Sequence, residues 1–236
     1  MIKSIQILIL VILVSTHSID NYAASFGGLK SKLGVGKNDT EKPADEEGVP
    51  SLDSLVETQS GIVKTLVAGL QDYAAGQAQV AKSLGLKEEV DKLESEQEAL
   101  ASGNVNDKSS IDKSMKITSS AQKAIDKKIA EGGTLSAESK VEFAKALPFY
   151  AKGTLNTIKL LPEVKDWGTS ASSVIKSAGL MNAGKLKSKL DTGLFIVSKL
   201  PKYMKTAKKS YGSLMAFSKK NEIDTSKADE LLGDDF

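Results

Sequence analysis

The sequence of 236 residues contains no cysteine and no arginine, and its single histidine is His17. Without cysteine the chain can form no disulfide, no thiolate metal site and no thiol nucleophile. All 32 basic residues are lysines, so the chain lacks the planar guanidinium group that grips phosphate or carboxylate and contacts guanine in DNA. These absences exclude sulfur chemistry and argue against specific nucleic-acid recognition.

Catalytic motifs are missing as well. Because His17 lies in a segment that we expect to be removed, catalysis could rest only on carboxylate pairs, serine with lysine, or tyrosine. The sequence has no phosphate-binding glycine loop, no metal-ligand spacing and no nucleophile elbow. We therefore expect a protein that is not an enzyme, with no catalytic residue, no cofactor and no metal.

Residues 1–25 have the layout of a secretory signal peptide. A lone lysine precedes an apolar run over residues 5–14, and Ala23 and Ser25 would occupy the −3 and −1 positions of a cleavage site before Phe26. The alternative is an uncleaved membrane anchor, but a membrane span needs about 20 apolar residues and this run is about half as long. The sequence therefore predicts an exported protein, periplasmic or extracellular.

The rest of the chain falls in the globular range, with 40% apolar and 26% charged residues. Residues 26–50 combine five glycines and two prolines with an acidic cluster. Such a segment buries too little apolar surface to offset the entropy lost on ordering. We expect a flexible linker over 26–50, a single helical-bundle domain over 51–221, and an acidic, mobile tail over 222–236 with a net charge of −5.

Apolar residues recur at intervals of three and four through most of residues 51–221, which predicts an all-α protein. The expected helices cover 51–84, 87–101, 107–131, 136–161, a short segment ending at residue 178, and 182–221. No segment shows the two-residue alternation of a β-strand. Because proline lacks an N–H donor, we expect an antiparallel bundle of about six helices with kinks at Pro148, Pro162 and Pro201.

Small residues mark two expected interruptions and one candidate helix contact. The glycine- and serine-rich residues 168–173 and the residues 179–184 are expected to break the helical pattern. Gly61, Gly69 and Gly76 are eight and seven residues apart and so lie near one line along the first helix. They either let a neighbouring helix approach closely or are tolerated at the surface.

The stretch over residues 182–221 is amphipathic and strongly cationic. Its leucines and methionines fall mainly on one side of an ideal helix and most of its lysines fall roughly opposite. It carries ten lysines against one acid, Asp191, a net charge of +9. Two acidic segments, 87–101 at −4 and 222–236 at −5, are candidates to neutralise it within the protein. The ten lysines are Lys185, Lys187, Lys189, Lys199, Lys202, Lys205, Lys208, Lys209, Lys219 and Lys220.

We therefore expect a non-enzymatic interaction or scaffold protein of the bacterial envelope or exterior, with a cationic face that binds an acidic protein or polymer. Two alternatives stay open: a membrane-active helical protein that binds anionic lipid, and a carrier of an apolar ligand between kinked helices. On an unbroken helix, both phenylalanines of the stretch would project among the lysines, so their burial decides between scaffold and site. The candidate residues for binding a partner or membrane are Phe195, Lys199, Lys202, Lys205, Lys209 and Phe217.

Overall fold

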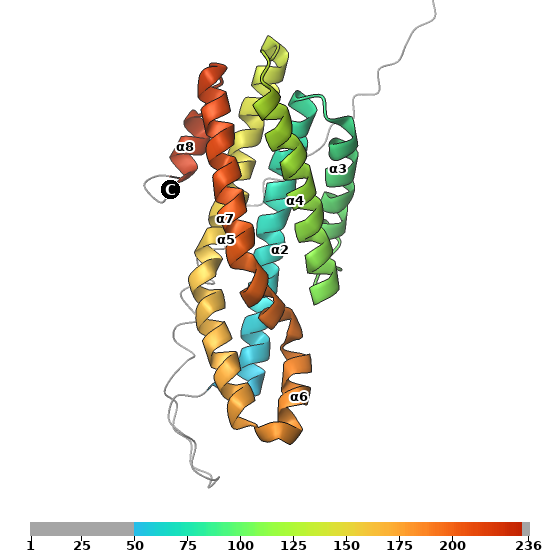
Figure 1. Cartoon of the computed structure of the whole chain (residues 1–236), viewed down its shortest axis with the longest axis vertical. Helices are drawn as coiled ribbons and strands as arrows, with labels where there is room; N and C mark the ends of the chain where they lie inside the picture. The colour runs from blue at the N-terminus through green and yellow to red at the C-terminus, as the bar shows by residue number, and fades with distance from the viewer. Residues whose placement is uncertain (1–49, 233–236) are drawn as a thin grey trace, which may run out of the picture. The chain divides into compact units, whose positions relative to one another are not determined.

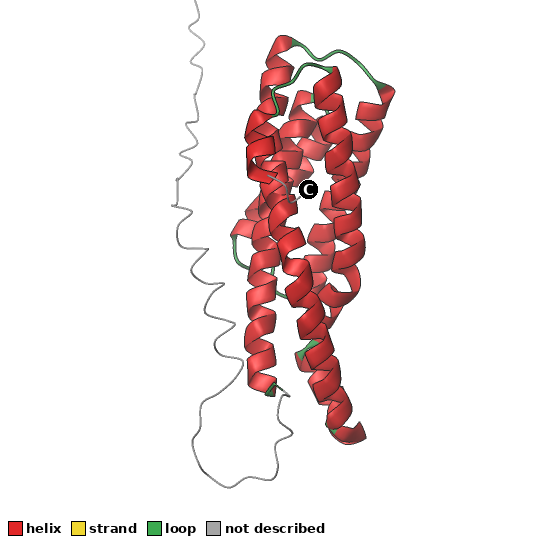
Figure 2. Cartoon of the chain, turned by 90° about the vertical axis from the view of Figure 1, so that its left-hand side faces the viewer, coloured by secondary structure: helices red, strands yellow, loops and turns green. Residues whose placement is uncertain are grey.

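The computed structural model describes residues 50–232, so the expected leader, nearly all of the expected linker and the last four residues lie outside the described range. Residues 50–232 form seven helices and no strand, which makes this part of the protein all-α (Figures 1 and 2). None of these seven helices is long and apolar enough to cross a membrane. The helices are α2 (Leu52–Ser83), α3 (Lys87–Ala101), α4 (Lys108–Glu131), α5 (Ala137–Ser177), α6 (Gly179–Lys189), α7 (Asp191–Lys220) and α8 (Ser226–Leu232).

Local sequence sets several helix ends. Ser51, Asp107 and Ser136 each accept a hydrogen bond from the backbone N–H three residues further on, and so cap α2, α4 and α5. Gly85 and Gly132 follow α2 and α4 with φ angles of +74° and +73°. Glycine adopts this left-handed conformation without steric cost, so both helices stop where the sequence predicts.

The most extensive helix contact in the fold joins α2 and α5. These helices run antiparallel, as the colours of Figure 1 show. Near one end the indole Nε1 of Trp167 donates to the backbone oxygen of Leu55 (2.9 Å), and further along Gly76 lies against Tyr150. Residue numbers therefore rise along α2 as they fall along α5.

A four-residue pattern, Tyr-Ala-x-Gly, lies at the α2–α5 crossing in both helices, over 73–76 and 150–153. A Cβ atom added to Gly76 would lie 2.7 Å from the backbone nitrogen of Tyr150, and one added to Gly153 would lie 2.5 Å from that of Tyr73. The backbone of each tyrosine thus occupies space left open by the glycine of the other helix. At this separation a side chain at either glycine would overlap main-chain atoms.

The sequence left two roles open for Gly61, Gly69 and Gly76: close approach of a neighbouring helix, or toleration at the surface. Two of the three glycines allow the close approach. Gly76 does so at Tyr150, and a Cβ atom on Gly69 would lie 2.6 Å from Oγ1 of Thr157 in α5. Gly61 is different, because a Cβ atom there would have no other side chain or neighbouring helix within 4 Å. Spacing alone does not distinguish these positions, since the difference depends on where α5 crosses.

The prediction that residues 168–173 interrupt a helix is wrong, because they continue α5. The hydroxyls of Thr169 and Ser172 donate to backbone oxygens four residues earlier in α5, at 3.1 and 2.7 Å. Each hydroxyl thus finds its hydrogen-bond partner within the helix. Gly168 is buried against Val197 of α7. Packing between helices therefore overrides the weak helix propensity of this segment.

The other expected interruptions also fall differently. The break expected over 179–184 is reduced to Gly179, whose φ of +70° separates α5 from α6. The stretch expected over 182–221 is divided at Leu190, between α6 and α7, rather than at its proline. The three prolines that were expected to kink helices lie inside α5 and α7, and bending at these prolines stays a prediction.

Part of the expected acidic tail is packed. Residues 226–232 form α8, which contacts α5, and the side chains of Ile223 and Ala228 are buried. Burial of apolar area holds this segment against the helices, which differs from the expectation of a mobile tail. Residues 233–236 lie outside the described range.

The α2–α5 contact makes a specific stability prediction for Gly153→Ala. We expect this change to lower the free energy of unfolding by about 1–3 kcal/mol, because the added methyl group would meet the backbone of Tyr73, which cannot rotate away. Urea unfolding followed by circular dichroism measures the effect. Gly61→Ala is the matched control and should raise stability by up to about 1 kcal/mol through helix propensity. Equal stability of Gly153→Ala and wild type would contradict the close crossing.

Candidate functional site

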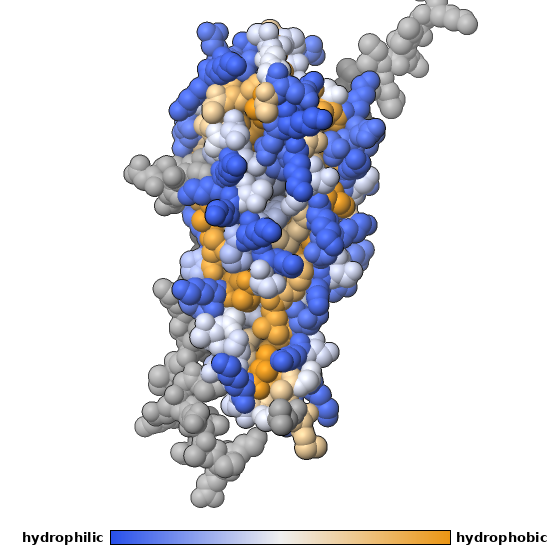
Figure 3. Space-filling view, viewed as in Figure 1, coloured by the Kyte–Doolittle hydropathy of each residue, from blue (hydrophilic) through white to orange (hydrophobic). Residues whose placement is uncertain are grey.

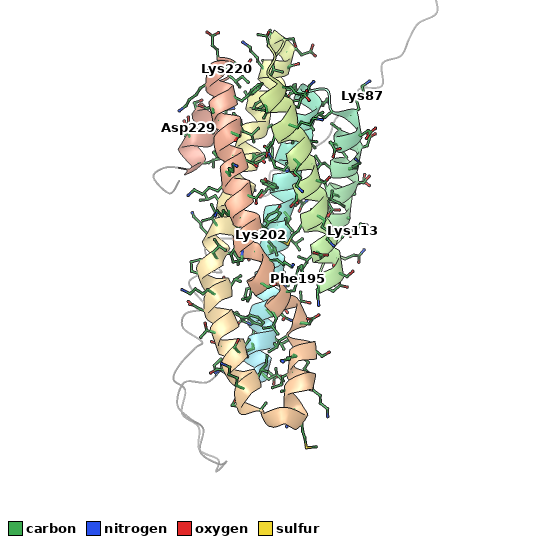
Figure 4. All side chains as sticks on the ribbon, viewed as in Figure 1. Lys87, Lys113, Phe195, Lys202, Lys220 and Asp229 are labelled. Atoms are coloured by element: carbon green, nitrogen blue, oxygen red, sulfur yellow. The ribbon has the colours of Figure 1, made fainter. Side chains whose placement is uncertain are left out.

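The lysines of α6 and α7 are the first candidate for a binding site, and we call these ten residues together the lysine surface. All ten lysines of the predicted cationic stretch are exposed (Figure 4, where Lys202 and Lys220 are labelled). The one acid of the stretch, Asp191, pairs with Lys108 of α4 at 3.1 Å. The four lysines proposed from sequence as binding residues form no ion pair with any acidic side chain in residues 50–232: Lys199, Lys202, Lys205 and Lys209.

The acidic helix α3 lies away from the lysine surface. α3 packs against α2 and α4, whereas α7 packs against α4 and α5, so α4 lies between α3 and α7 (Figure 1). Two of the α3 acids, Glu88 and Glu89, lie 4.0 and 3.1 Å from Lys92 of the same helix. α3 is therefore not positioned to neutralise the lysine surface.

Phe195 and Phe217 are both buried, with exposed fractions of 9% and 7%. Phe217 packs against Phe143 of α5, with ring centroids 5.5 Å apart. Phe195, labelled in Figure 4, lines a pocket together with Asp112 of α4 and Lys199 of α7. Because α7 contacts both α4 and α5, its buried side is wider than that of a helix with one neighbour. The two phenylalanines belong to the core, which favours a scaffold role for this stretch, so a binding surface here would consist of the four lysines alone.

A second candidate site is a groove between α5 and α7, which we call the α5–α7 groove. Its volume is about 720 Å³, and no acidic side chain lines it. Figure 3 shows hydrophobic side chains gathered over the lower parts of α5 and α7, with hydrophilic side chains around them. The lining residues are Leu161, Val164, Lys165, Gly168, Thr169, Ser172, Ser173, Lys176, Val197 and Pro201.

One tight contact between α5 and α7 lies in the lining of the groove. A Cβ atom added to Gly168 would lie 2.9 Å from the Val197 side chain, so the two helices touch at this point. Trp167, the only tryptophan in the sequence, is buried beside Gly168 and is held by its hydrogen bond to Leu55. Its ring fills the space next to Gly193 of α7. The groove therefore lies directly on the packed core.

The residues of the groove have no distinguishing pattern in the sequence. On α5 they recur at intervals of three and four, which is the ordinary spacing of residues on one side of a helix. The wall supplied by α7 follows about 30 residues later in the sequence. Only the packing of the two helices turns these positions into a site.

A third feature is a buried polar network at the α2–α5 crossing. The hydroxyl of Tyr150 donates to Oε1 of Gln122 in α4, and the Tyr73 hydroxyl lies 2.8 Å from the Tyr150 hydroxyl and 3.3 Å from the same Oε1. Nε2 of Gln77 donates to Oε1 of Gln122 at 2.8 Å and to the backbone oxygen of Thr118 at 2.9 Å. Three helices are thus joined inside the core.

The network extends from α4 to α7. Nε2 of Gln122 donates to Oδ1 of Asp126 at 2.7 Å, and the hydroxyl of Ser210 in α7 donates to Oδ2 of Asp126 at 2.9 Å. The hydroxyls of Thr118 and Tyr203 are 2.9 Å apart. None of these side chains lines either of the two pockets described above. The network therefore connects four helices and is enclosed by them, which indicates a structural role.

Burial raises the pKa of each tyrosine in this network. For Tyr73 and Tyr150 the pKa lies well above the usual value near 10, and removal from water is the largest cause in both. Removal from water is also the largest cause for Tyr203. The three phenols are therefore protonated at neutral pH and serve as hydrogen-bonding groups.

No family model, curated protein or solved structure matches this chain. Within residues 50–232 no cluster of histidine, cysteine, aspartate or glutamate has the arrangement of a metal site.

The buried tyrosines should make the protein sensitive to alkaline pH. Above about pH 10 the unfolded chain releases phenolic protons that the folded chain retains, so the free energy of unfolding falls as pH rises. Each buried tyrosine should lower the free energy of unfolding by up to about 1.4 kcal/mol for each pH unit above about pH 10. Urea unfolding at several values from about pH 8 to about pH 11 measures the slope.

Tyr150→Phe provides the comparison for this slope, because it removes one buried phenol and leaves every other ionisable residue in place. The variant should lose less stability per pH unit than the wild type above about pH 10. In the wild type, the phenolate absorbance of these tyrosines should rise together with the loss of helical circular dichroism. Phenolate formation by all the tyrosines at about pH 10 in a protein that is still helical would contradict the buried network.

Proposed function

We propose that the chain is an exported, non-enzymatic protein, an antiparallel bundle of kinked helices behind a flexible linker, that binds an acidic protein or polymer through its lysine surface. The observation that supports this most is that ten exposed lysines occupy two consecutive helices whose single acid is paired with Lys108. Export through a leader over residues 1–25 belongs to the same proposal. N-terminal sequencing of the exported chain, expected to begin at Phe26, would test it.

The spacing of the lysines favours an extended polyanion over a single anion. Lys202, Lys205 and Lys209 are three and four residues apart, so they follow one line along α7 at roughly one helical turn, about 5 Å. This spacing is shorter than the Debye length of about 8 Å at physiological ionic strength, so their fields add. A single exposed ion pair contributes at most about 1 kcal/mol, so binding by this surface depends on many pairs at once.

Lysine chemistry also sets the kind of recognition. An ammonium group is a compact point charge, without the planar fork that arginine uses for bidentate contacts. A surface built only from lysines therefore favours charge density over a particular pattern of acceptors. This property fits an acidic polymer or an acidic protein segment.

The burial of Phe195 and Phe217 favours this function over insertion into a membrane. A helix that lies in a membrane interface needs an exposed apolar face beside its basic residues. In α7 the apolar side is packed inside the protein, including Leu200 and Met204. The exposed side of α7 thus carries charge but lacks large apolar anchors.

Binding of poly-L-glutamate to the full chain tests the proposal. The fourfold variant with Lys199, Lys202, Lys205 and Lys209 replaced by glutamine should bind about tenfold more weakly or worse, because four contacts of up to about 1 kcal/mol each are lost. Binding by the wild type should weaken as salt is raised. Isothermal titration calorimetry at two salt concentrations gives both comparisons.

The matched control carries the same charge change elsewhere. Lys87, Lys113, Lys123 and Lys127 are exposed on α3 and α4 and form no ion pair with a described acid, so their replacement by glutamine should leave binding within about twofold of the wild type. Equal losses in the two variants would show that net charge, and not the lysine surface, drives binding. Binding to anionic liposomes without any binding to the polymer would overturn the proposal in favour of the membrane alternative.

A further inference from the structure

The α5–α7 groove is polar at one end and apolar at the other. α5 and α7 run antiparallel here, since Phe143 contacts Phe217 and Gly168 contacts Val197. Pro201 of α7 therefore lies at the same end of the groove as Leu161. That end is apolar, whereas the other end is lined by Ser172, Ser173 and Lys176.

The polar end offers donors for an anionic head group. Ser173 and Lys176 are three residues apart on α5 and so share one side of the helix. Lys176 is exposed and forms no ion pair with a described acid, and the Ser173 hydroxyl forms no hydrogen bond with a described residue. The hydroxyls of Thr169 and Ser172 differ, because both donate to backbone oxygens of α5.

The apolar end offers a floor for a hydrocarbon chain. Val164 is 2% exposed, and Leu161 and Val197 are partly buried against the core. From residue 161 to residue 176 the groove follows α5 over 15 residues, about 22 Å at 1.5 Å per residue. One acyl chain can lie along such a surface, and its burial there removes apolar area from water.

We infer that the α5–α7 groove binds a long-chain fatty acid, with the carboxylate at Ser173 and Lys176 and the chain directed toward Leu161 and Pro201. Charge complementarity selects this occupant, because the lining contains two lysines and no acid. Lys165 stands beside the apolar half, where its methylene groups can cover the chain while the ammonium stays in water. This site goes beyond the proposed function and does not use the four lysines assigned to the acidic partner.

Trp167 makes the inference directly measurable. It is the only tryptophan in the sequence and precedes Gly168, a lining residue of the groove. A dibrominated stearic acid, added to the full chain below its micelle concentration, should quench Trp167 fluorescence, because bromine atoms on the chain would lie close to the indole. Unlabelled stearic acid should restore the fluorescence, and stearyl alcohol should compete at least about fivefold more weakly because it lacks the charged head group.

Two variants locate the ligand. Lys176→Ala should weaken quenching by the brominated acid at least about fivefold, through loss of a charge-assisted hydrogen bond. Ser172→Phe should reduce binding by filling the groove, and its exposed position leaves the core unchanged. Lys113→Ala, on α4, is the control and should bind like the wild type. Circular dichroism of each variant verifies that it is folded.

The fatty-acid site would be contradicted by an absence of quenching in the wild type. It would also be contradicted by quenching that is unchanged in both Lys176→Ala and Ser172→Phe. Equal competition by stearic acid and stearyl alcohol would contradict the binding of the carboxylate by Lys176. The fourfold glutamine variant of the lysine surface should keep full quenching, so failure of the acidic-partner proposal and failure of this one are distinguishable.

Discussion

The close approach of α2 and α5 is the constraint on which the rest of the structure depends. Gly76 leaves room for the backbone of Tyr150, and Gly153 leaves room for that of Tyr73. The two tyrosine rings are consequently only 4.5 Å apart between centroids, with their hydroxyls 2.8 Å apart. A shift of one helix along the other would place a Cβ atom against main chain, so the glycines and tyrosines together specify one register.

The positions of α4 and α7 follow from this crossing. Buried hydroxyl and amide groups are costly without partners, and Gln122 of α4 supplies the acceptor for the paired tyrosines. Asp126 then links α4 to Ser210 of α7. α7 is thereby held with its lysines outward on one side and with Val197 against α5 on the other. The network therefore helps to position α7, which carries seven of the ten lysines of the lysine surface and one wall of the α5–α7 groove.

Features set by neighbouring residues in the sequence could be predicted, and features set by distant contacts could not. The all-helical class follows from apolar periodicity, and Ser51 and Gly132 mark helix ends through local chemistry. Residues 168–173 have weak helix propensity and are helical because α7 packs on them. Phe195 and Phe217 fall among lysines on an isolated helix, but two neighbouring helices cover them. The lysines of the candidate site were found because exposed charge is apparent in the sequence itself.

If the rest of the structure depends on the α2–α5 crossing, this crossing should be the most stable part of the fold. Native-state hydrogen exchange tests this most directly. Amides over residues 69–76 and 150–157 should exchange only through global unfolding, so their exchange free energy should equal the free energy of unfolding from urea denaturation. Amides of α6, which makes few contacts with other helices, should exchange through local opening at lower free energy. Exchange of the α2 and α5 amides at lower free energy than those of α7 would contradict the claim.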